Sequence, residues 1–329
     1  MHQAIRRGEA VCERIRIQTP ILSAPMAGAS APSLSIAAAN AGGLGSCGVL
    51  LMKGEEILAW SKEVRSNSNG AFQLNVWIPD PAPVRDEANV AKVRGFPAAW
   101  GPNAPKEAGD TVLQLDAMLE AASQITSSAM GLSPRHFVDK MKKRRTPWFE
   151  CINSSGNQGS PSRRSRSNRR PGIGSRGHRK CFSANDAILK QVGLFSSLPA
   201  VVDAVKLPVV ATGCIADARG VAAALMLRQR SSDWHRLSKV PGSKDSSGLG
   251  ERNRSRRARS TMVSMVFSGR AGRSLATDYA RAATVPSAPC PHCTHAGRGC
   301  EGRRRQSRAS QGGTMRESGA VRSSGRVYQ

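Results

Sequence analysis

Aromatic residues and long apolar runs are scarce in this chain. Of its 329 residues, 4% are Phe, Trp or Tyr, and no run of 18 or more apolar residues occurs, which argues against a membrane span. The opening residues, MHQAIRRGEAVCERIR, lack the apolar stretch of a secretion signal. Eight cysteines are too few for a disulfide scaffold in so long a chain. We therefore expect a cytoplasmic protein with reduced thiols and no membrane partner.

Acidic residues are also few, 23 against 49 basic ones, which gives a formal charge of +26. Most of this excess lies in residues 151–180, 228–260 and 289–329, which together hold 26 basic, five acidic and only two aromatic residues. Basic tracts bind phosphate without sequence choice, and these contain almost no aromatic rings that could stack on bases. We predict non-specific polyanion adhesion and no specific nucleic-acid partner.

The remaining parts of the chain are nearly neutral and alternate short apolar runs with amphipathic stretches. Strands are predicted at 20–24, 44–51, 72–78, 124–129, 147–149 and 207–212, and helices at 54–66, 111–122 and 218–227, among others. Repeated βα units with short turns predict a parallel sheet. This many in succession favour the α/β class, as a (β/α)8 TIM-type barrel, over a doubly wound sheet.

Several motifs occur in an order that resembles one enzyme family. They are PILSAPMAG (20–28), NAGGLGSCG (40–48), AFQLNVWIP (71–79), ITSSAMG (125–131), GHR with CF (177–182) and PVVATG with IADARGVAAALML (208–227), and the likeness continues over 261–286. This series resembles the nitronate monooxygenase family of FMN-dependent α/β barrels. The resemblance implies an enzyme that oxidises alkyl nitronates or nitroalkanes with O2 to a carbonyl compound and nitrite.

The resemblance also implies where the flavin and the substrate bind. Active sites of α/β barrels lie at the carboxyl ends of the strands, and phosphates bind at glycine-rich turns before helices. The residues expected to bind FMN are Ala24, Pro25, Met26, Asn75, Ser128, Gly177, Gly213 and Cys214. His178 is the expected catalytic base, taking an α-proton from a nitroalkane or orienting the nitronate. Cys214 places a side chain where the family has a second glycine of the phosphate turn.

The basic segments fall where barrel units are expected. We interpret residues 1–288 as an FMN-binding barrel interrupted at 151–176 and 228–260, followed by a disordered basic tail at 289–329. Segments so poor in apolar residues cannot offset the entropy of ordering, roughly 1–2 kcal/mol per residue. We expect them to supply no buried strand, leaving the barrel incomplete and the activity of this chain impaired. Translation out of frame across them would explain their composition.

Two other functions stay open on the sequence. Enoyl reductases of fatty-acid synthesis share the barrel and FMN, and a non-catalytic basic protein that binds nucleic acid non-specifically is the alternative of another class. In the tail, Cys290, Cys293, His295 and Cys300 are residue types that bind zinc. Their spacing is not that of a zinc knuckle, so no metal site is predicted.

Overall fold

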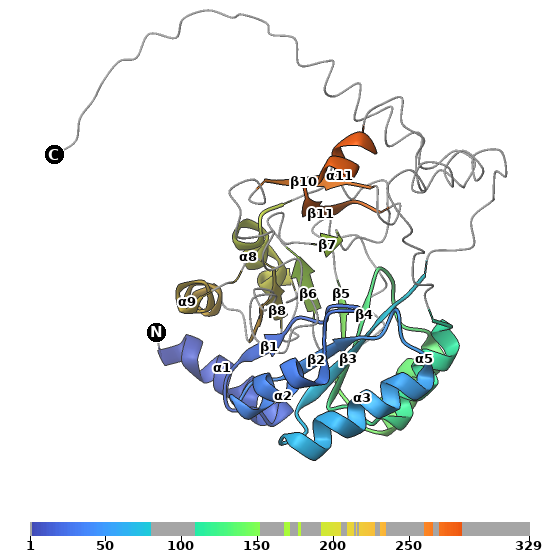
Figure 1. Cartoon of the computed structure of the whole chain (residues 1–329). Coiled ribbons are helices and arrows are strands. Elements are labelled where there is room, and N and C mark those ends of the chain that lie inside the picture. Colours follow the sequence, from blue (N-terminus) through green and yellow to red (C-terminus); the bar gives the residue numbers. More distant parts are fainter. Residues whose placement is uncertain are drawn as a thin grey trace, which may run out of the picture.

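The computed structural model describes residues 2–79, 109–151, 168–171, 177–178, 192–204, 209–213, 215, 217–227, 231–234, 260–265 and 270–284. These residues form a parallel sheet surrounded by helices, with a small second sheet beyond one end of it (Figure 1). Among the described helices, none has both the length and the apolar character that crossing a bilayer requires.

Eight parallel strands make up the main sheet. They are β1 (Ile21–Ser23), β2 (Gly45–Gly48), β3 (Phe72–Trp77), β4 (Ile125–Ala129), β5 (Trp148–Cys151), β6 (Asn168–Pro171), β8 (Val209–Thr212) and β9 (Ser231–Trp234). The order across the sheet is β1-β9-β8-β6-β5-β4-β3-β2. The two end strands also meet, because the Ser23 N–H donates to the Leu44 carbonyl at 2.8 Å and the Leu44 N–H donates to the Ile21 carbonyl at 3.0 Å. The sheet therefore closes on itself, which confirms the predicted TIM-type barrel.

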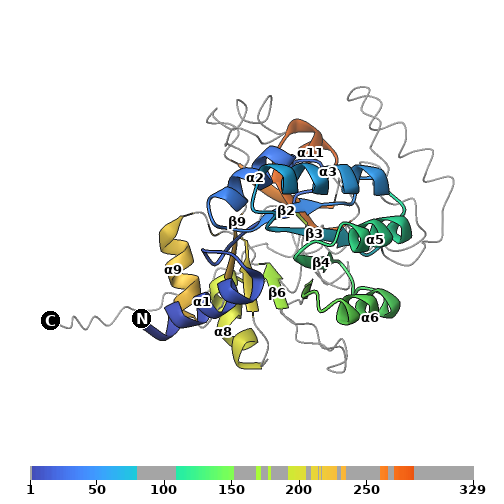
Figure 2. The same ribbon diagram turned by 90° about the horizontal axis from the view of Figure 1, so that it is seen from below.

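Helices cover the outside of this barrel. Four of them follow β1 to β4 in the chain: α2 (Pro32–Asn40), α3 (Gly54–Asn67), α5 (Thr111–Glu120) and α6 (Arg135–Lys143). Two more, α8 (Leu194–Ala204) and α9 (Ala218–Met226), come before and after β8 in the chain (Figure 2). The residues that follow β5 and β9 lie outside the described part of the chain.

Two barrel strands come from segments that we expected to supply none. β6 pairs with β5 and β8, and β9 pairs with β8 and β1. The expectation is therefore wrong for these residues. A short strand between two neighbours is held by backbone N–H and C=O groups, which every residue except Pro carries in full, so its pairing does not require apolar side chains. Most other residues of 151–176 and 228–260, and all of 289–329, lie outside the described residues, so the domain boundaries there stay a prediction.

Alternation along β3 shows which side chains face the barrel interior. Phe72, Leu74 and Val76 lie in the apolar layer formed with α3 and α5. Successive side chains of a strand point to opposite faces, so Gln73 and Asn75 point inward. The Gln73 Nε2 accordingly donates to the Ser23 carbonyl of β1 at 3.0 Å. The polar residues of β3 thus face the barrel interior, and its apolar residues pack against α3 and α5.

A helix that the sequence did not predict covers the amino-terminal end of the barrel. This helix, α1 (His2–Ile15), contributes Val11 and Ile15 to a buried cluster that includes Leu22, Ile125 and Val210 of the strands. Val210 alternates with Val209 and Ala211, which pack with α8, and Ile125 is the register partner of the inward-facing Gln73, so both face inward. The amino-terminal end of the barrel is therefore filled by apolar side chains.

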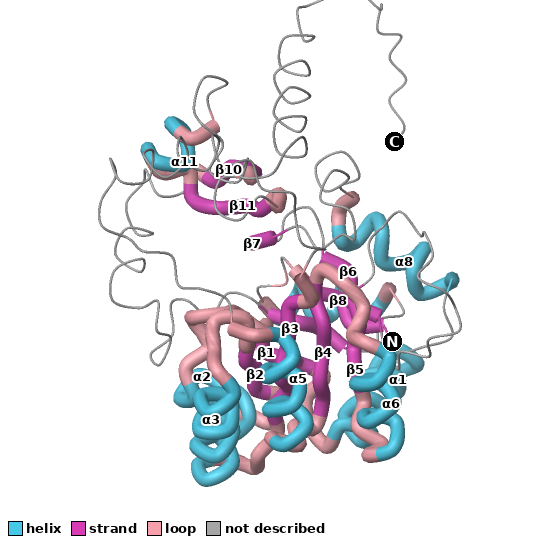
Figure 3. The backbone as a smooth tube through the Cα atoms, turned by 90° about the vertical axis from the view of Figure 1, so that its right-hand side faces the viewer, coloured by secondary structure: helices cyan, strands magenta, loops and turns pink. Residues whose placement is uncertain are grey.

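The small antiparallel sheet lies at the opposite end. It has the order β10 (Thr261–Ser264), β11 (Gly272–Leu275) and β7 (Gly177–His178), and α11 (Asp278–Ala282) follows it in the chain. Figures 1 and 3 show this sheet beyond the end of the barrel that is remote from α1. It therefore lies over the carboxyl ends of the strands, where barrel enzymes carry their active sites.

Candidate functional site

A buried pair of polar side chains joins β3 and β4 near their carboxyl ends. Asn75 and Ser127 are partners in the strand register, and the Asn75 Nδ2 donates to the Ser127 Oγ at 2.8 Å. The exposed fractions of the two residues are 9% and 2%. An amide carries two N–H donors and an acceptor oxygen, so this bond fixes its orientation without using all its bonding capacity. The bond fixes the direction of the Asn75 amide at this end of the barrel, and its role in flavin binding stays a prediction.

The predicted flavin-facing residues Pro25 and Met26 lie in a tight turn after β1, and both are half-buried. The Met26 N–H donates to the Ser30 Oγ, and the Ser30 N–H donates to the Met26 carbonyl, each at 3.1 Å. From α3, the Trp60 Nε1 donates to the Ser30 carbonyl at 3.0 Å. These bonds fix the backbone that presents Pro25 and Met26. Ala24, just before them, is 1% exposed.

Gly48, at the end of β2, makes room for this turn. A Cβ atom at Gly48 would lie 2.8 Å from the Ala27 nitrogen and 3.2 Å from its Cα. Real Cβ atoms do not approach backbone so closely, so a larger residue would displace the Met26–Ala27 segment. Gly48 is also the register partner of Asn75. The sequence motif contains this glycine, but only the fold shows what lies against it.

The predicted base His178 reaches the same region from the small sheet. Its ring centroid lies 4.7 Å from that of Trp77, with the planes at 83°, and the residue is half-buried. Trp77 is the last residue of β3 and stands two positions after Asn75, on the same inward side of the strand. Asn75, Trp77 and His178 therefore gather at one end of the barrel. The catalytic role of His178 stays a prediction.

A buried arginine lies between the small sheet and the barrel. Arg270 is 4% exposed, and its Nη1 donates to the Met130 Sδ at 3.2 Å. Met130 directly follows β4 and has a φ of 67°, a left-handed conformation that non-glycine residues adopt rarely. Sequence reasoning missed Arg270 because one arginine among 49 basic residues gives no sign of burial.

The predicted phosphate turn is described in part. Gly213 directly follows β8, is buried, and has a φ of 103°, which suits glycine and disfavours other residues. Cys214 lies outside the described residues. Gly177 stands beside His178 on β7. As ligands of a phosphate or flavin, these three residues stay predictions.

Ser128 lies on the other side of β4 from Ser127. Its register partner is Val76, which faces the outer helices, and its hydroxyl donates to the Gly131 carbonyl at 3.0 Å. The role of Ser128 in cofactor binding stays a prediction, whereas Ser127 is the serine that contacts Asn75. The alternation of polar and apolar residues along β3 marks Asn75 as inward-facing, but its partner on β4 follows only from the register of the two strands.

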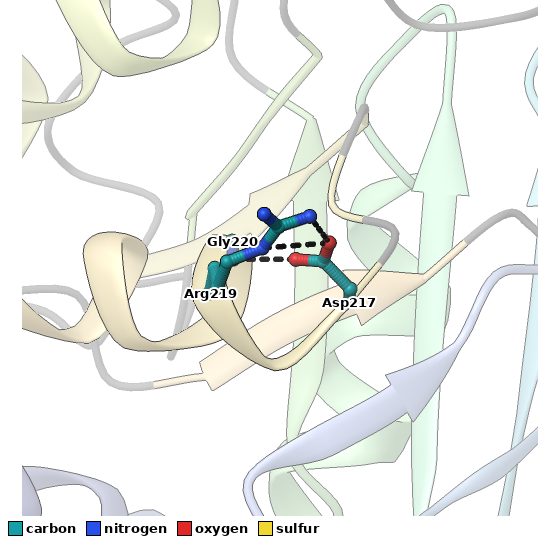
Figure 4. A network of polar contacts seen from close by, with 3 residues as sticks. All are labelled: Asp217, Arg219 and Gly220. Atoms are coloured by element: carbon teal, nitrogen blue, oxygen red, sulfur yellow. Dashed lines mark hydrogen bonds and ion pairs between the residues drawn. The ribbon is translucent and has the colours of Figure 1, made fainter.

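Asp217, four residues after Gly213, is the N-cap of α9 and belongs to a small charged network (Figure 4). The Asp217 carboxylate accepts the Gly220 N–H at 3.1 Å and the Arg219 Nη2 at 2.6 Å. Hydrogen bonds from Arg219 and from the Gly220 backbone lower the pKa of Asp217 below its ordinary value of 3.8. An ionised carboxylate thus caps the helix that follows the predicted phosphate turn.

The described residues include groups of the kinds that a flavin requires. Within the described ranges, no group of three or more His, Cys, Asp or Glu side chains is placed to hold a metal, and the cysteine-rich tail lies outside them. A flavin requires an apolar wall, amide contacts and a turn that approaches its phosphate. Residues of these kinds lie at one end of the barrel, namely Pro25 with Met26, Asn75, and Gly213 with its left-handed φ, and their contact with a flavin stays a prediction.

Comparison with known proteins agrees with this class of barrel enzyme. The sequence model of the nitronate monooxygenase family matches residues 9–228. The chain belongs to the nitronate monooxygenase family, a family of flavin-dependent oxidoreductases. Curated relatives include the nitronate monooxygenase of Paraburkholderia phytofirmans, 29% identical over 303 residues that cover 86% of this chain and 80% of the relative. That of Pseudomonas aeruginosa is 29% identical over 295 residues, covering 83% and 81%.

Solved structures with the same fold confirm the architecture. A nitroalkane oxidase from Streptomyces ansochromogenes superposes with a TM-score of 0.75 at 23% identity, covering 92% of this chain and 88% of that one. FabK from Thermotoga maritima gives a TM-score of 0.64 at 23% identity, covering 83% and 76%. At 23% identity these structures show that the chain has the barrel fold. The reaction has to be inferred from the residues of the site.

Proposed function

We propose that this chain is an FMN-dependent enzyme that oxidises alkyl nitronates with O2. The single observation that carries the proposal is the gathering of Asn75, Trp77 and His178 at the carboxyl end of a barrel, in a chain matched by the family model over residues 9–228. The substrates are a small nitronate or nitroalkane and O2, and the products are a carbonyl compound and nitrite. Two nitronate anions and one O2 balance as two carbonyl compounds and two nitrite ions.

Each residue of the site has a role that its position supports. Pro25 and Met26 would form the apolar wall against the isoalloxazine ring, Asn75 would donate to its polar edge, and Gly213 would approach the phosphate. FMN, when bound, supplies the capacity to accept electrons from a carbanionic substrate and pass them to O2. The small sheet over the end of the barrel would limit the access of water to the site.

His178 would act on the substrate proton. The α-proton of a nitroalkane is acidic, and an imidazole whose unperturbed pKa is near neutrality is suited to remove it. A nitronate has already lost this proton, so with a nitronate His178 would only orient the anion. This difference gives the proposal a sharp test.

The test compares nitroethane with preformed ethyl nitronate in the flavin-loaded chain and in His178→Gln. We expect the variant to lose about 100-fold or more in kcat with nitroethane, in keeping with the usual contribution of a general base, and clearly less with the nitronate. His136→Gln is the matched control, because His136 is exposed on α6. Equal losses with both substrates would contradict the role of His178 as a base.

Anaerobic bleaching of the flavin tests the reaction class. Bleaching by ethyl nitronate, followed by nitrite release when O2 is admitted, is the expected result. Bleaching by NADH, with turnover of an enoyl thioester, would instead show the enoyl reductase alternative. The same assay measures whether the activity of this chain is impaired, as its basic segments lead us to expect. Non-specific polyanion adhesion and a cytoplasmic location stay predictions of the sequence.

A further inference from the structure

We propose that Trp77 is a positioning residue that sets the direction of the His178 imidazole. The proposal rests on the proposed function, in which His178 acts on the substrate. The two rings meet edge to face, with centroids 4.7 Å apart and planes at 83°. Aromatic rings prefer this arrangement because the positive edge of one meets the negative face of the other. The contact thus favours one orientation of the imidazole over others.

The strand that carries His178 is short and lies at the edge of the small sheet. β7 has two residues, and its described pairing is with β11, where His178 is opposite Gly272 and Gly177 is opposite Arg273. The register partner of His178 is a glycine, so that position of β11 offers no side chain for a cross-strand pair. The ring of Trp77 comes from the barrel, and it therefore supplies a contact that β11 does not.

A second contact holds the small sheet over the same two barrel strands. Arg270 lies two residues before Gly272 on the way into β11, and its Nη1 donates to the Met130 Sδ at 3.2 Å. Met130 directly follows Ala129, which is the register partner of Trp77. The His178–Trp77 and Arg270–Met130 contacts therefore lie side by side at the ends of β3 and β4. Both contacts join the small sheet to the end of the barrel that carries Asn75.

The consequence is that Trp77 affects how well His178 meets the substrate proton. A misplacement of about 1 Å in a reacting group can cost about 100-fold in rate. We expect Trp77→Leu to lower kcat with nitroethane by about 10- to 100-fold while KM changes much less. Trp77→Phe retains a ring at the same position and should restore most of the loss.

The direct readout is the proton spectrum of histidine-labelled protein. A ring placed edge to face with His178 shifts its imidazole proton signals, which are identified by their disappearance in His178→Gln. These signals should lose the shift that the indole ring causes in Trp77→Leu and keep part of it in Trp77→Phe. The signal of His136, exposed on α6, should be the same in every variant and serves as the internal control.

Several outcomes would overturn the proposal. Unchanged His178 signals in folded Trp77→Leu would do so, as would a loss of kcat that Trp77→Phe does not rescue. Should Trp77→Leu fail to fold, Trp77→Phe is compared with the parent chain instead. A smaller ring at this position must still alter the chemical shift of the His178 imidazole protons, and an unaltered shift would overturn the proposal. If Trp77→Leu moves the His178 signals but His178→Gln retains full activity, the orientation by Trp77 stands and the proposed base role fails.

Discussion

The Asn75 amide and the Ser127 hydroxyl form a buried hydrogen bond of 2.8 Å between two adjacent strands of the barrel. Both side chains point into the barrel close to its carboxyl end, and each is the register partner of the other. A buried polar pair of this kind costs stability if either member is removed, because the other is left without its partner. The pair thus links the stability of the barrel to the geometry of the site.

Removal of the Asn75 amide should weaken flavin binding. Loss of a buried hydrogen-bonding group costs about 1–3 kcal/mol, so Asn75→Ala is expected to raise the Kd for FMN by about 5- to 150-fold. Quenching of flavin fluorescence during titration measures this Kd. Asn40→Ala is the matched control, since the Asn40 side chain makes an exposed bond to the Asn67 carbonyl on the outside of the barrel. An FMN affinity unchanged in Asn75→Ala would remove Asn75 from the cofactor site.

A methyl group at Gly48 should disturb the turn that presents Met26. In Gly48→Ala the added Cβ would lie 2.8 Å from the Ala27 nitrogen, and overpacking of this kind costs about 1–3 kcal/mol. We expect a lower urea midpoint together with weaker FMN binding. Gly54→Ala serves as the control, because its Cβ would meet nothing closer than 3.5 Å. Similar behaviour of the two variants would mean that the turn adapts freely.

Truncation of Ile125 should destabilise the amino-terminal end of the barrel. Ile125 is fully buried among inward-facing residues and the side chains of α1. Replacement by Ala in such a core typically costs about 2–5 kcal/mol in the free energy of unfolding. Urea denaturation followed by circular dichroism measures this cost. Val112→Ala, at a position 61% exposed, should change stability by less than about 0.5 kcal/mol. A loss below that limit in Ile125→Ala would argue against the packing of α1 on the barrel.

The cap of α9 should make stability depend on pH in the acid range. The pKa of Asp217 is lowered in the folded chain, mainly by its hydrogen bond from Arg219 and then by the Gly220 N–H. The folded state therefore binds this proton less readily than the unfolded state. The stabilisation is present above the unfolded value of 3.8 and is lost as pH falls through the lower folded pKa.

Asp217→Asn tests this dependence because an amide retains an oxygen that can accept the Gly220 N–H but carries no charge. The variant should unfold at a lower urea concentration than the parent chain at pH 7. The difference should shrink at pH values well below 3.8. A difference that is the same at both pH values would show that the charge of Asp217 is irrelevant to stability.

Within the described residues, the sequence alone determined the barrel and most of its strands. Apolar runs bounded by turn residues located β3 and β4 within one or two residues, because hydrophobic periodicity and Pro or Gly punctuation are local properties. The order of the motifs determined the family, and that family is confirmed by the match over residues 9–228.

The tertiary structure decided which residues meet. β6 and β9 escaped prediction because their pairing uses the backbone groups of strands distant in sequence, and their composition carries no sign of it. Gly48 against Ala27, Trp77 against His178, and Arg270 against Met130 are likewise contacts between separate elements. A local pattern specifies a strand or a helix, but the neighbours of a side chain are set only when the barrel closes and brings remote strand ends together.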